Sequence, residues 1–180
     1  MKKGILIFLM LLFATSVFGY ILVPIPPTIP ATPTPENLSG TYGGLWNKST
    51  GGFITINLVT PEVYVPINSL NIGEFSGITS QGGQNLTIQV AGMYQASSMA
   101  SFNKGQVSEF GMKLFHNGVG KDQCYSHFET SALLGATPSF VCLLRLSVGD
   151  KIYVAVDDHA NPVNDPVLTN FNLNLVRIGE

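Results

Sequence analysis

The polar residues with the clearest capacity for chemistry gather in one short stretch, DDHANPVND, at residues 157–165. It contains three carboxylates, Asp157, Asp158 and Asp165, together with two asparagines and a histidine. Hard oxygen ligands on a loop are typical of calcium sites. The same residue types form turns and favour a solvated loop that binds nothing. The stretch therefore predicts either a calcium loop or an ordinary polar loop.

The two cysteines, Cys124 and Cys142, are the only sulfur groups that can form a covalent crosslink. An even cysteine count in an exported chain favours a disulfide. Their flanking segments, QCYSHFE and SFVCLLRL, have the pattern of neighbouring strands, so we expect a bridge across a hairpin. Such a bridge would close a loop of about 18 residues and stabilise the fold by roughly 3 kcal/mol. The alternative is two separate buried thiols.

Catalytic motifs are absent from the chain. It contains no G-x-S-x-G, H-E-x-x-H, C-x-x-C or phosphate-binding loop. The three histidines, His116, His127 and His159, are far apart in sequence and form no recognisable pattern. A secreted hydrolase is therefore the weakest hypothesis, and we expect a protein that is not an enzyme and needs no cofactor other than the calcium considered above.

Composition places the chain among globular proteins with an unusually uncharged surface. Its 180 residues include 9 Lys and Arg against 11 Asp and Glu, a net charge of −2. Charged residues make up 11% of the chain, compared with about 25% in an average soluble domain, whereas 45% are apolar. So few cations argue against nucleic-acid binding. The high content of apolar residues argues against a disordered chain.

The N-terminus predicts export. A positive start, MKK, precedes an apolar run over residues 4–13, and Val17-Phe18-Gly19 fits a signal-peptidase site before Tyr20. We interpret residues 1–19 as a signal peptide. The alternative is an uncleaved anchor, because residues 5–23 carry no charge and are just long enough to cross a bilayer. Either interpretation predicts a secreted or cell-surface protein, in contact with a membrane only if the segment is uncleaved.

A proline-rich segment, YILVPIPPTIPATPTPE, follows at residues 20–36 and holds six of the 11 prolines. Proline fixes φ and removes a backbone donor, so this segment is expected to be an extended linker of the polyproline type. It is either a stiff spacer or an arm that docks on a neighbouring subunit.

From residue 37 onward the chain has the pattern of short strands. Period-2 alternation recurs between turn residues, and no stretch of 12 or more residues has a helical period. Residues 37–180 are therefore predicted to form an all-β, two-sheet antiparallel jelly-roll sandwich of eight to ten strands. The expected strands cover residues 53–59, 62–67, 85–90, 93–102, 110–118, 124–130, 140–148, 151–156 and 169–178.

The order of four short motifs resembles a known family. Gly92-Met93-Tyr94 opens a strand, LFHNG ends one at residue 118, LRLSVGDKI follows at residues 144–152, and NFNLNL closes the chain. This order resembles the jelly-roll heads of complement component one, subcomponent q, and of the tumour-necrosis-factor superfamily, in their microbial or viral versions. The resemblance covers roughly residues 60–178. Its matched residues also have plain structural roles in core and turns: Gly92, Tyr94, Asn117, Gly118, Leu144, Leu146, Gly149 and Asp150.

The resemblance implies assembly into a homotrimer through aromatic and aliphatic strand faces. Candidates for core or interface are the aromatic residues Tyr42, Trp46, Phe53, Tyr64, Tyr94 and Tyr153. The favoured hypothesis is an exported binding or adhesion module, whose ligand is an extracellular protein or glycan. The alternative is a structural subunit of a filament, coat or virion that uses residues 20–36 as an inter-subunit arm. The prolines argue against that arm as a central strand, which favours the module.

Overall fold

The computed structural model describes residues 40–47, 53–103, 107–159 and 164–180. The expected signal segment, residues 1–19, and the expected linker, residues 20–36, lie outside these described residues. Residues 37–180 cluster as one compact unit. Within the described part of the chain, no helix is long and apolar enough to cross a membrane.

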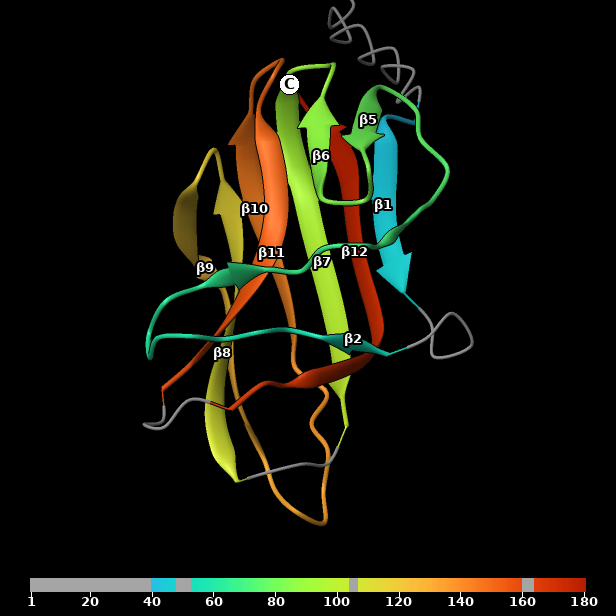
Figure 1. Ribbon diagram of the computed structural model, residues 1–180. Coiled ribbons are helices and arrows are strands. Elements are labelled where there is room, and N and C mark those ends of the chain that lie inside the picture. The colour runs from blue at the N-terminus through green and yellow to red at the C-terminus, as the bar shows by residue number, and fades with distance from the viewer. Residues whose placement is uncertain (1–39, 48–52, 104–106, 160–163) are drawn as a thin grey trace, which may run out of the picture. The chain divides into compact units, whose positions relative to one another are not determined.

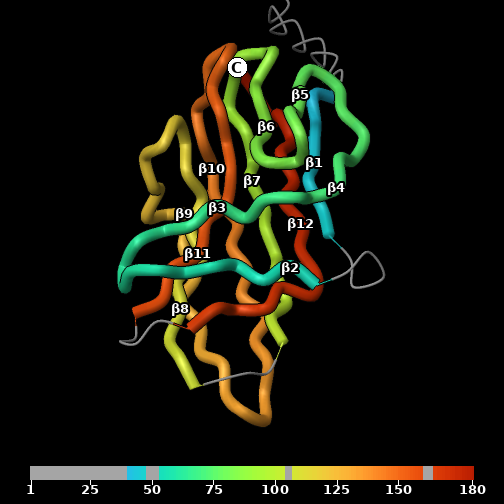
Figure 2. Tube along the Cα trace, viewed as in Figure 1, coloured from blue at the N-terminus to red at the C-terminus, as the bar shows by residue number. Residues whose placement is uncertain are grey.

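The described residues form twelve strands in two antiparallel sheets, shown as a ribbon in Figure 1 and as a Cα tube in Figure 2. The first sheet has the order β10 (Ser139–Leu146), β7 (Gly92–Phe102), β12 (Val167–Gly179), β1 (Tyr42–Asn47) and β4 (Asn71–Ile72), and β2 (Ile54–Thr55) pairs with β12. The second sheet has the order β5 (Ile78–Gln81), β6 (Asn85–Ile88), β11 (Lys151–Asp158), β8 (Ser108–His116) and β9 (Val119–Thr130), and β3 (Val65–Pro66) pairs with β11.

The predicted all-β sandwich is confirmed, but the number and limits of the early strands differ. Strands β1, β4 and β5 were not predicted. Their sequences, YGGLWN, NI and ITSQ, are short or glycine-rich, so pairing with neighbours and not local propensity makes them strands. Conversely, of the predicted strands at 53–59 and 62–67, only Ile54–Thr55 and Val65–Pro66 pair.

The hydrophobic core lies between the two sheets, and along β7 and β10 its residues follow the alternation of the pleat. Strand β10 alternates exposed and buried residues from end to end, and β7 does nearly the same. The two leucines expected in the core, Leu144 and Leu146, are buried, as are Ile152 and Val154 across the sandwich.

The two cysteines form the expected disulfide, with Cα atoms 5.4 Å apart. The expected hairpin geometry is wrong, because β9 is the edge of the second sheet and β10 is the edge of the first. The connection after β9 crosses between the sheets, and there Ala136 exchanges backbone hydrogen bonds with Phe102 of β7. The bridge between Cys124 and Cys142 therefore joins the two sheets at one side of the sandwich.

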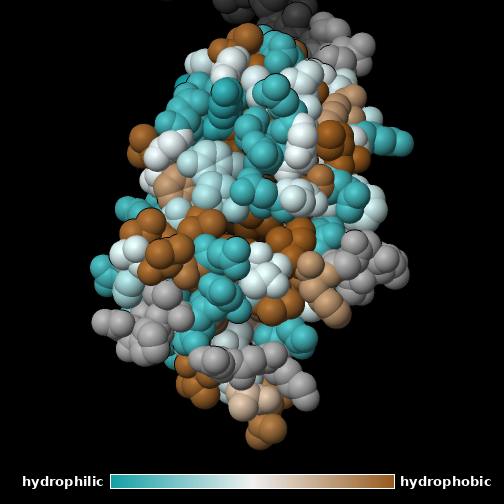
Figure 3. Space-filling model, in the orientation of Figure 1, coloured by the Kyte–Doolittle hydropathy of each residue, from teal (hydrophilic) through white to brown (hydrophobic). Residues whose placement is uncertain are grey.

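Residues 54–70 run across the sandwich as two adjacent crossing segments, which contain β2 and β3 (Figures 1 and 2). Four apolar side chains anchor them in the core: Ile56, Leu58, Ile67 and Leu70. At the turn between the segments, Val59 and Val63 remain exposed. Figure 3 shows an apolar band at the level of these segments on the face in view.

Candidate functional site

The outward face of the first sheet carries three rows of residues that contain no charge. The strand register aligns the members of each row across β10, β7, β12 and β1. We call these twelve residues the uncharged face. In row order they are Ser139, Met99, Asn172 and Trp46; Val141, Ser97, Asn174 and Gly44; and Leu143, Gln95, Val176 and Tyr42.

Half of the uncharged face is apolar or aromatic and strongly exposed. Leu143 and Val141 are 56% and 64% exposed on β10, and Met99, Val176 and Trp46 are each more than 40% exposed. Single exposed apolar residues are common, but a contiguous group of them on one sheet usually marks an interaction surface. The polar members are amides and hydroxyls, which can form hydrogen bonds across an interface without burying a charge.

The middle row has the smallest side chains and forms a shallow hollow. Gly44, Ser97 and Asn174 lie in it, with Tyr42 and Val176 on one side. Its volume is about 490 Å³, and Glu74 lies at its rim beyond β4. A hollow with small residues at its base and Tyr42 and Val176 beside it is suited to receive a side chain from a partner.

The outward face of the second sheet has a different character. Its aligned rows across β11, β8 and β9 include Glu109, Lys113, Glu129 and Asp157, besides two histidines. Lys113 is ion-paired to Asp122 at 3.0 Å and lies over the rings of Tyr64 and Tyr125. The second outward face therefore carries charges within its rows, whereas the three rows of the uncharged face carry none.

The aromatic residues singled out from the sequence divide between these environments. Tyr94 is fully buried, and its hydroxyl donates to the carbonyl of Val90. Tyr42 and Trp46 lie on the uncharged face. Tyr64 and Tyr153 belong to an aromatic group around Phe115 on the second sheet. Phe53 is 63% exposed outside both groups.

Two of the four matched motifs form turns that pack together. Asn117 and Gly118 both have positive φ and form the two-residue turn between β8 and β9. Gly149 has φ +89° in the turn between β10 and β11, a conformation that favours glycine. Gly92, at the start of β7, would carry a Cβ that clashes with the Gly179 carbonyl. These positions are occupied by glycine for backbone reasons.

Asp150 connects the two turns. One carboxylate oxygen accepts from the Ser147 N–H at 2.8 Å, and the other accepts from the Asn117 side-chain amide at 2.7 Å. His116 Nε2 lies 2.8 Å from the first oxygen. Burial acts to raise the pKa of Asp150, but these partners together outweigh it and lower that pKa below its ordinary value.

We expect Asp150→Ala to lower the free energy of unfolding by about 2 kcal/mol at pH 7, because it leaves charge-assisted hydrogen bonds unmade. Since the folded-state pKa is lowered, this stabilisation is present above the ordinary pKa of 3.8 and is lost as the pH falls through the folded-state value. Urea unfolding at a series of pH values measures it. Asp122→Ala, at a side chain that is 94% exposed, is the control. A difference between Asp150→Ala and the wild type that persists undiminished at the lowest pH would contradict this role.

The predicted calcium residues separate in the structure. Asp157 and Asp158 are consecutive in β11 and point to opposite faces, and both are buried. Asp158 accepts from Ser108 Oγ and from the Asn164 N–H, each at 2.6 Å, whereas Asp165 accepts from the Leu58 N–H at 2.7 Å. Among the described residues, no group of three or more His, Cys, Asp and Glu side chains is placed so that it could hold a metal ion. Calcium binding stays a prediction.

Asp157 points outward but is covered by neighbouring side chains. Burial raises its pKa, which His159, the Gly111 N–H and the Tyr64 hydroxyl oppose. A sequence pattern does not predict these surroundings, because Gly111 and Tyr64 come from two other segments that are far from Asp157 in sequence.

Two antiparallel sheets with these connections define a jelly-roll head. Comparisons with protein-family models and with curated protein sequences gave no match. Among solved structures, Eiger TNF from S. frugiperda superimposes with a TM-score of 0.59 at 12% identity, covering 78% of this chain and 94% of that one. The globular domain of zebrafish complement 1qA protein gives 0.52 at 15% identity, covering 77% and 97%. The PRD1 vertex protein P5 gives 0.53 at 14% identity, covering 77% and 96%.

These likenesses establish the fold as that of the tumour-necrosis-factor and complement-type heads. The resemblance inferred from the four motifs is therefore confirmed at the level of the fold. Identities of 12–15% carry no statement about ligand or activity.

Proposed function

We propose that this protein is an exported, non-enzymatic jelly-roll head that assembles as a homotrimer and acts as an extracellular binding or adhesion module. The uncharged face carries the proposal. Six exposed apolar side chains on one sheet, surrounded by amides and hydroxyls, match the composition of an interface core, from which charges are depleted. Self-association through this face would remove them from water.

The remaining surfaces support a role in binding. If the uncharged face is used for assembly, the second sheet stays accessible with its carboxylates, Lys113 and the aromatic group around Phe115. Aromatic residues are enriched at surfaces that recognise other proteins, and charged residues are found at their solvent-accessible rims. The disulfide supports export, because such bonds persist in oxidising compartments.

A structural subunit is the second candidate, and the likeness to a vertex protein favours it. In that case residues 20–36 would act as an arm to the next subunit. Light scattering after size exclusion separates the candidates, with chains that begin at residue 20 and at residue 37. Trimers from both chains would support the binding module. Polymers from the longer chain alone would support the arm.

We expect Val176→Asp to convert the trimer into single chains. Val176 lies on the central strand β12, between Gln95 and Tyr42 in its row. If the chains assemble through this face, the substitution buries one aspartate from every copy in the interface. Bringing these like charges together costs several kcal/mol. The molar mass from light scattering should fall threefold with an unchanged circular dichroism spectrum.

Val119→Asp is the matched control, because Val119 is 61% exposed at the start of β9 on the other sheet. It should leave the mass unchanged. An intact trimer in Val176→Asp would contradict assembly through the uncharged face.

A further inference from the structure

The connection between β9 and β10 presents two adjacent leucines to solvent. Leu133 and Leu134 are 82% and 71% exposed, and Val107, directly before β8, is 76% exposed. Among the described large apolar side chains, only one other, Val59, is more than 70% exposed. Three of these four side chains therefore belong to the segments at one end of the sandwich. We call residues 131–135, with the sequence SALLG, the leucine tip.

The leucine tip extends beyond the ends of the neighbouring strands. It lies at the lower end of Figure 1, whereas β1 begins and β12 ends at the upper end. Ser108 pairs with Thr130, so Val107 lies beside the start of the tip. Figure 3 shows apolar atoms at the same lower end of the face in view. The tip is thus remote from the point at which the described chain begins.

Hydrogen bonds within the tip satisfy much of its backbone. Ser131 Oγ accepts from the N–H groups of Leu133 and Leu134 at 3.3 and 3.0 Å, and the Ser131 N–H donates to the Leu134 carbonyl at 2.9 Å. Behind the tip, Ala136 exchanges backbone hydrogen bonds with Phe102 of β7. Backbone groups that already have partners cost little to move out of water, whereas unpaired ones are costly. The two leucines are therefore held outward on a loop whose backbone tolerates an apolar medium.

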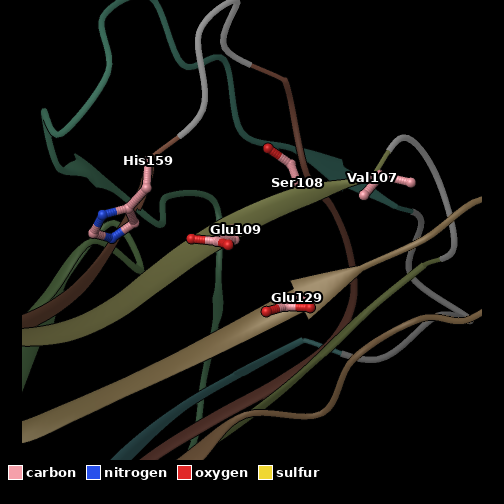
Figure 4. A pocket seen from close by; sticks show the side chains of 5 residues that line it. All are labelled: Val107, Ser108, Glu109, Glu129 and His159. Carbon is pink, nitrogen blue, oxygen red and sulfur yellow. The ribbon is translucent and has the colours of Figure 1, made fainter.

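The charges around the tip limit the kind of surface that it can enter. Residues 131–138 contain no charged side chain, so burying the tip desolvates no charge. Behind the tip, Glu109 and Glu129 face each other in the register of β8 and β9. Figure 4 shows both glutamates and Val107 around a hollow of about 390 Å³. These carboxylates disfavour the approach of an anionic surface.

We propose that the leucine tip inserts into the apolar layer of an electrically neutral lipid bilayer. A protruding apolar loop fits either a matching pocket or a fluid apolar phase, and a bilayer needs no preformed complement. The hydroxyls of Ser131 and Thr137 flank the leucines in sequence and suit the headgroup level. The inference names a lipid surface as the ligand of the proposed binding module. In the proposed homotrimer, three tips engage one membrane together, so this gain in affinity rests on the proposed function.

The test uses the exported chain, residues 20–180, because residues 1–19 would bind lipid by themselves. This chain contains every described residue, and circular dichroism with a cooperative melting transition establishes that it is folded. Co-sedimentation with phosphatidylcholine vesicles compares the wild type with Leu133→Ser/Leu134→Ser. We expect the double variant to bind at least about tenfold more weakly, because two leucines no longer leave water on binding. Its melting temperature should be unchanged, since both side chains are exposed.

Val59→Ser/Val63→Ser is the matched control. It removes two exposed valines at the turn between the crossing segments and should bind vesicles as the wild type does. Leu134→Trp adds a reporter at the tip, and its emission, taken as the difference from the wild type, should shift to the blue with vesicles. Mixing phosphatidylserine in equal parts into the vesicles should weaken binding, and stronger binding to the mixture would overturn the assignment to neutral lipid.

Four results would overturn insertion of the tip. Absence of vesicle binding by the wild type would do so and would leave an apolar pocket of a protein as the partner. Equal binding by the wild type and Leu133→Ser/Leu134→Ser, or an unchanged Leu134→Trp emission, would also do so. A lower molar mass of the double serine variant would assign the leucines to a contact between copies.

Light scattering of the wild type separates this inference from the proposed function. Single chains that still bind vesicles through the tip would overturn the homotrimer alone. Trimers that do not bind vesicles would overturn the tip alone.

Discussion

Replacement of Phe128 by alanine is expected to lower the free energy of unfolding by about 3–5 kcal/mol. Phe128 of β9 stacks on Phe102 of the first sheet, with ring centroids 4.7 Å apart, and on Phe110 of β8 at 5.3 Å. All three rings are at most 7% exposed. Truncating the central ring would leave a cavity that rigid neighbouring strands cannot fill.

Urea unfolding followed by circular dichroism measures this loss. Phe53→Ala is the matched control, because Phe53 is 63% exposed and its truncation should change stability by less than about 0.5 kcal/mol. Phe128→Leu should retain part of the stability, since it keeps more apolar volume in the site. Equal stability of Phe128→Ala and the wild type would show that this ring stack is not part of the cooperative core.

Removing the disulfide is expected to cost about 3 kcal/mol. The bond between Cys124 and Cys142 has a sequence separation of 18, and constraining a loop of that length in the unfolded chain stabilises the fold by about this amount. The experiment compares Cys124→Ala/Cys142→Ala with the wild type in urea unfolding. Replacing both residues avoids leaving a reactive thiol.

The position of the bond between two sheet edges adds a second expectation. Since β9 and β10 share no backbone ladder, only side-chain packing holds them together once the bond is gone. Hydrogen exchange in the double variant should rise most at β9 and β10. A reductant should lower wild-type stability to that of the variant and leave the variant unchanged. Unequal free energies of unfolding for the reduced wild type and the double variant would indicate that the alanines themselves perturb the core.

Much of the fold was predictable because it depends on local patterns. Alternation over residues 139–146 dictates one buried face whatever the partner strand, and the predicted strand, residues 140–148, differs from β10 by one residue at its start and two at its end. Asn117-Gly118 and Gly149-Asp150 predicted turns because their backbone conformations require those residue types. The order of these motifs was enough to indicate the jelly-roll head.

The sequence contained signals for the uncharged face, but these signals did not identify the strands that form it. The segment SFVCLLRL is apolar on both faces, with Val141 and Leu143 between buried residues. Because the outward face of an antiparallel sheet is commonly polar, such a strand indicates an interaction surface on that side. The sequence did not indicate which other strands lie beside it, because the rows of the uncharged face depend on register between β10, β7, β12 and β1.

Spacing and residue type by themselves thus determined the all-β class, the core positions of the long strands, the turns and the pairing of the two cysteines. Only the tertiary structure decided that the disulfide joins two sheets, that three rows without charge line up on one outward face, and that Asp157 lies beside His159. The physical reason is the pleat and the register. The pleat directs the neighbouring aspartates Asp157 and Asp158 to opposite sides, whereas strand register brings together residues that are far apart in sequence.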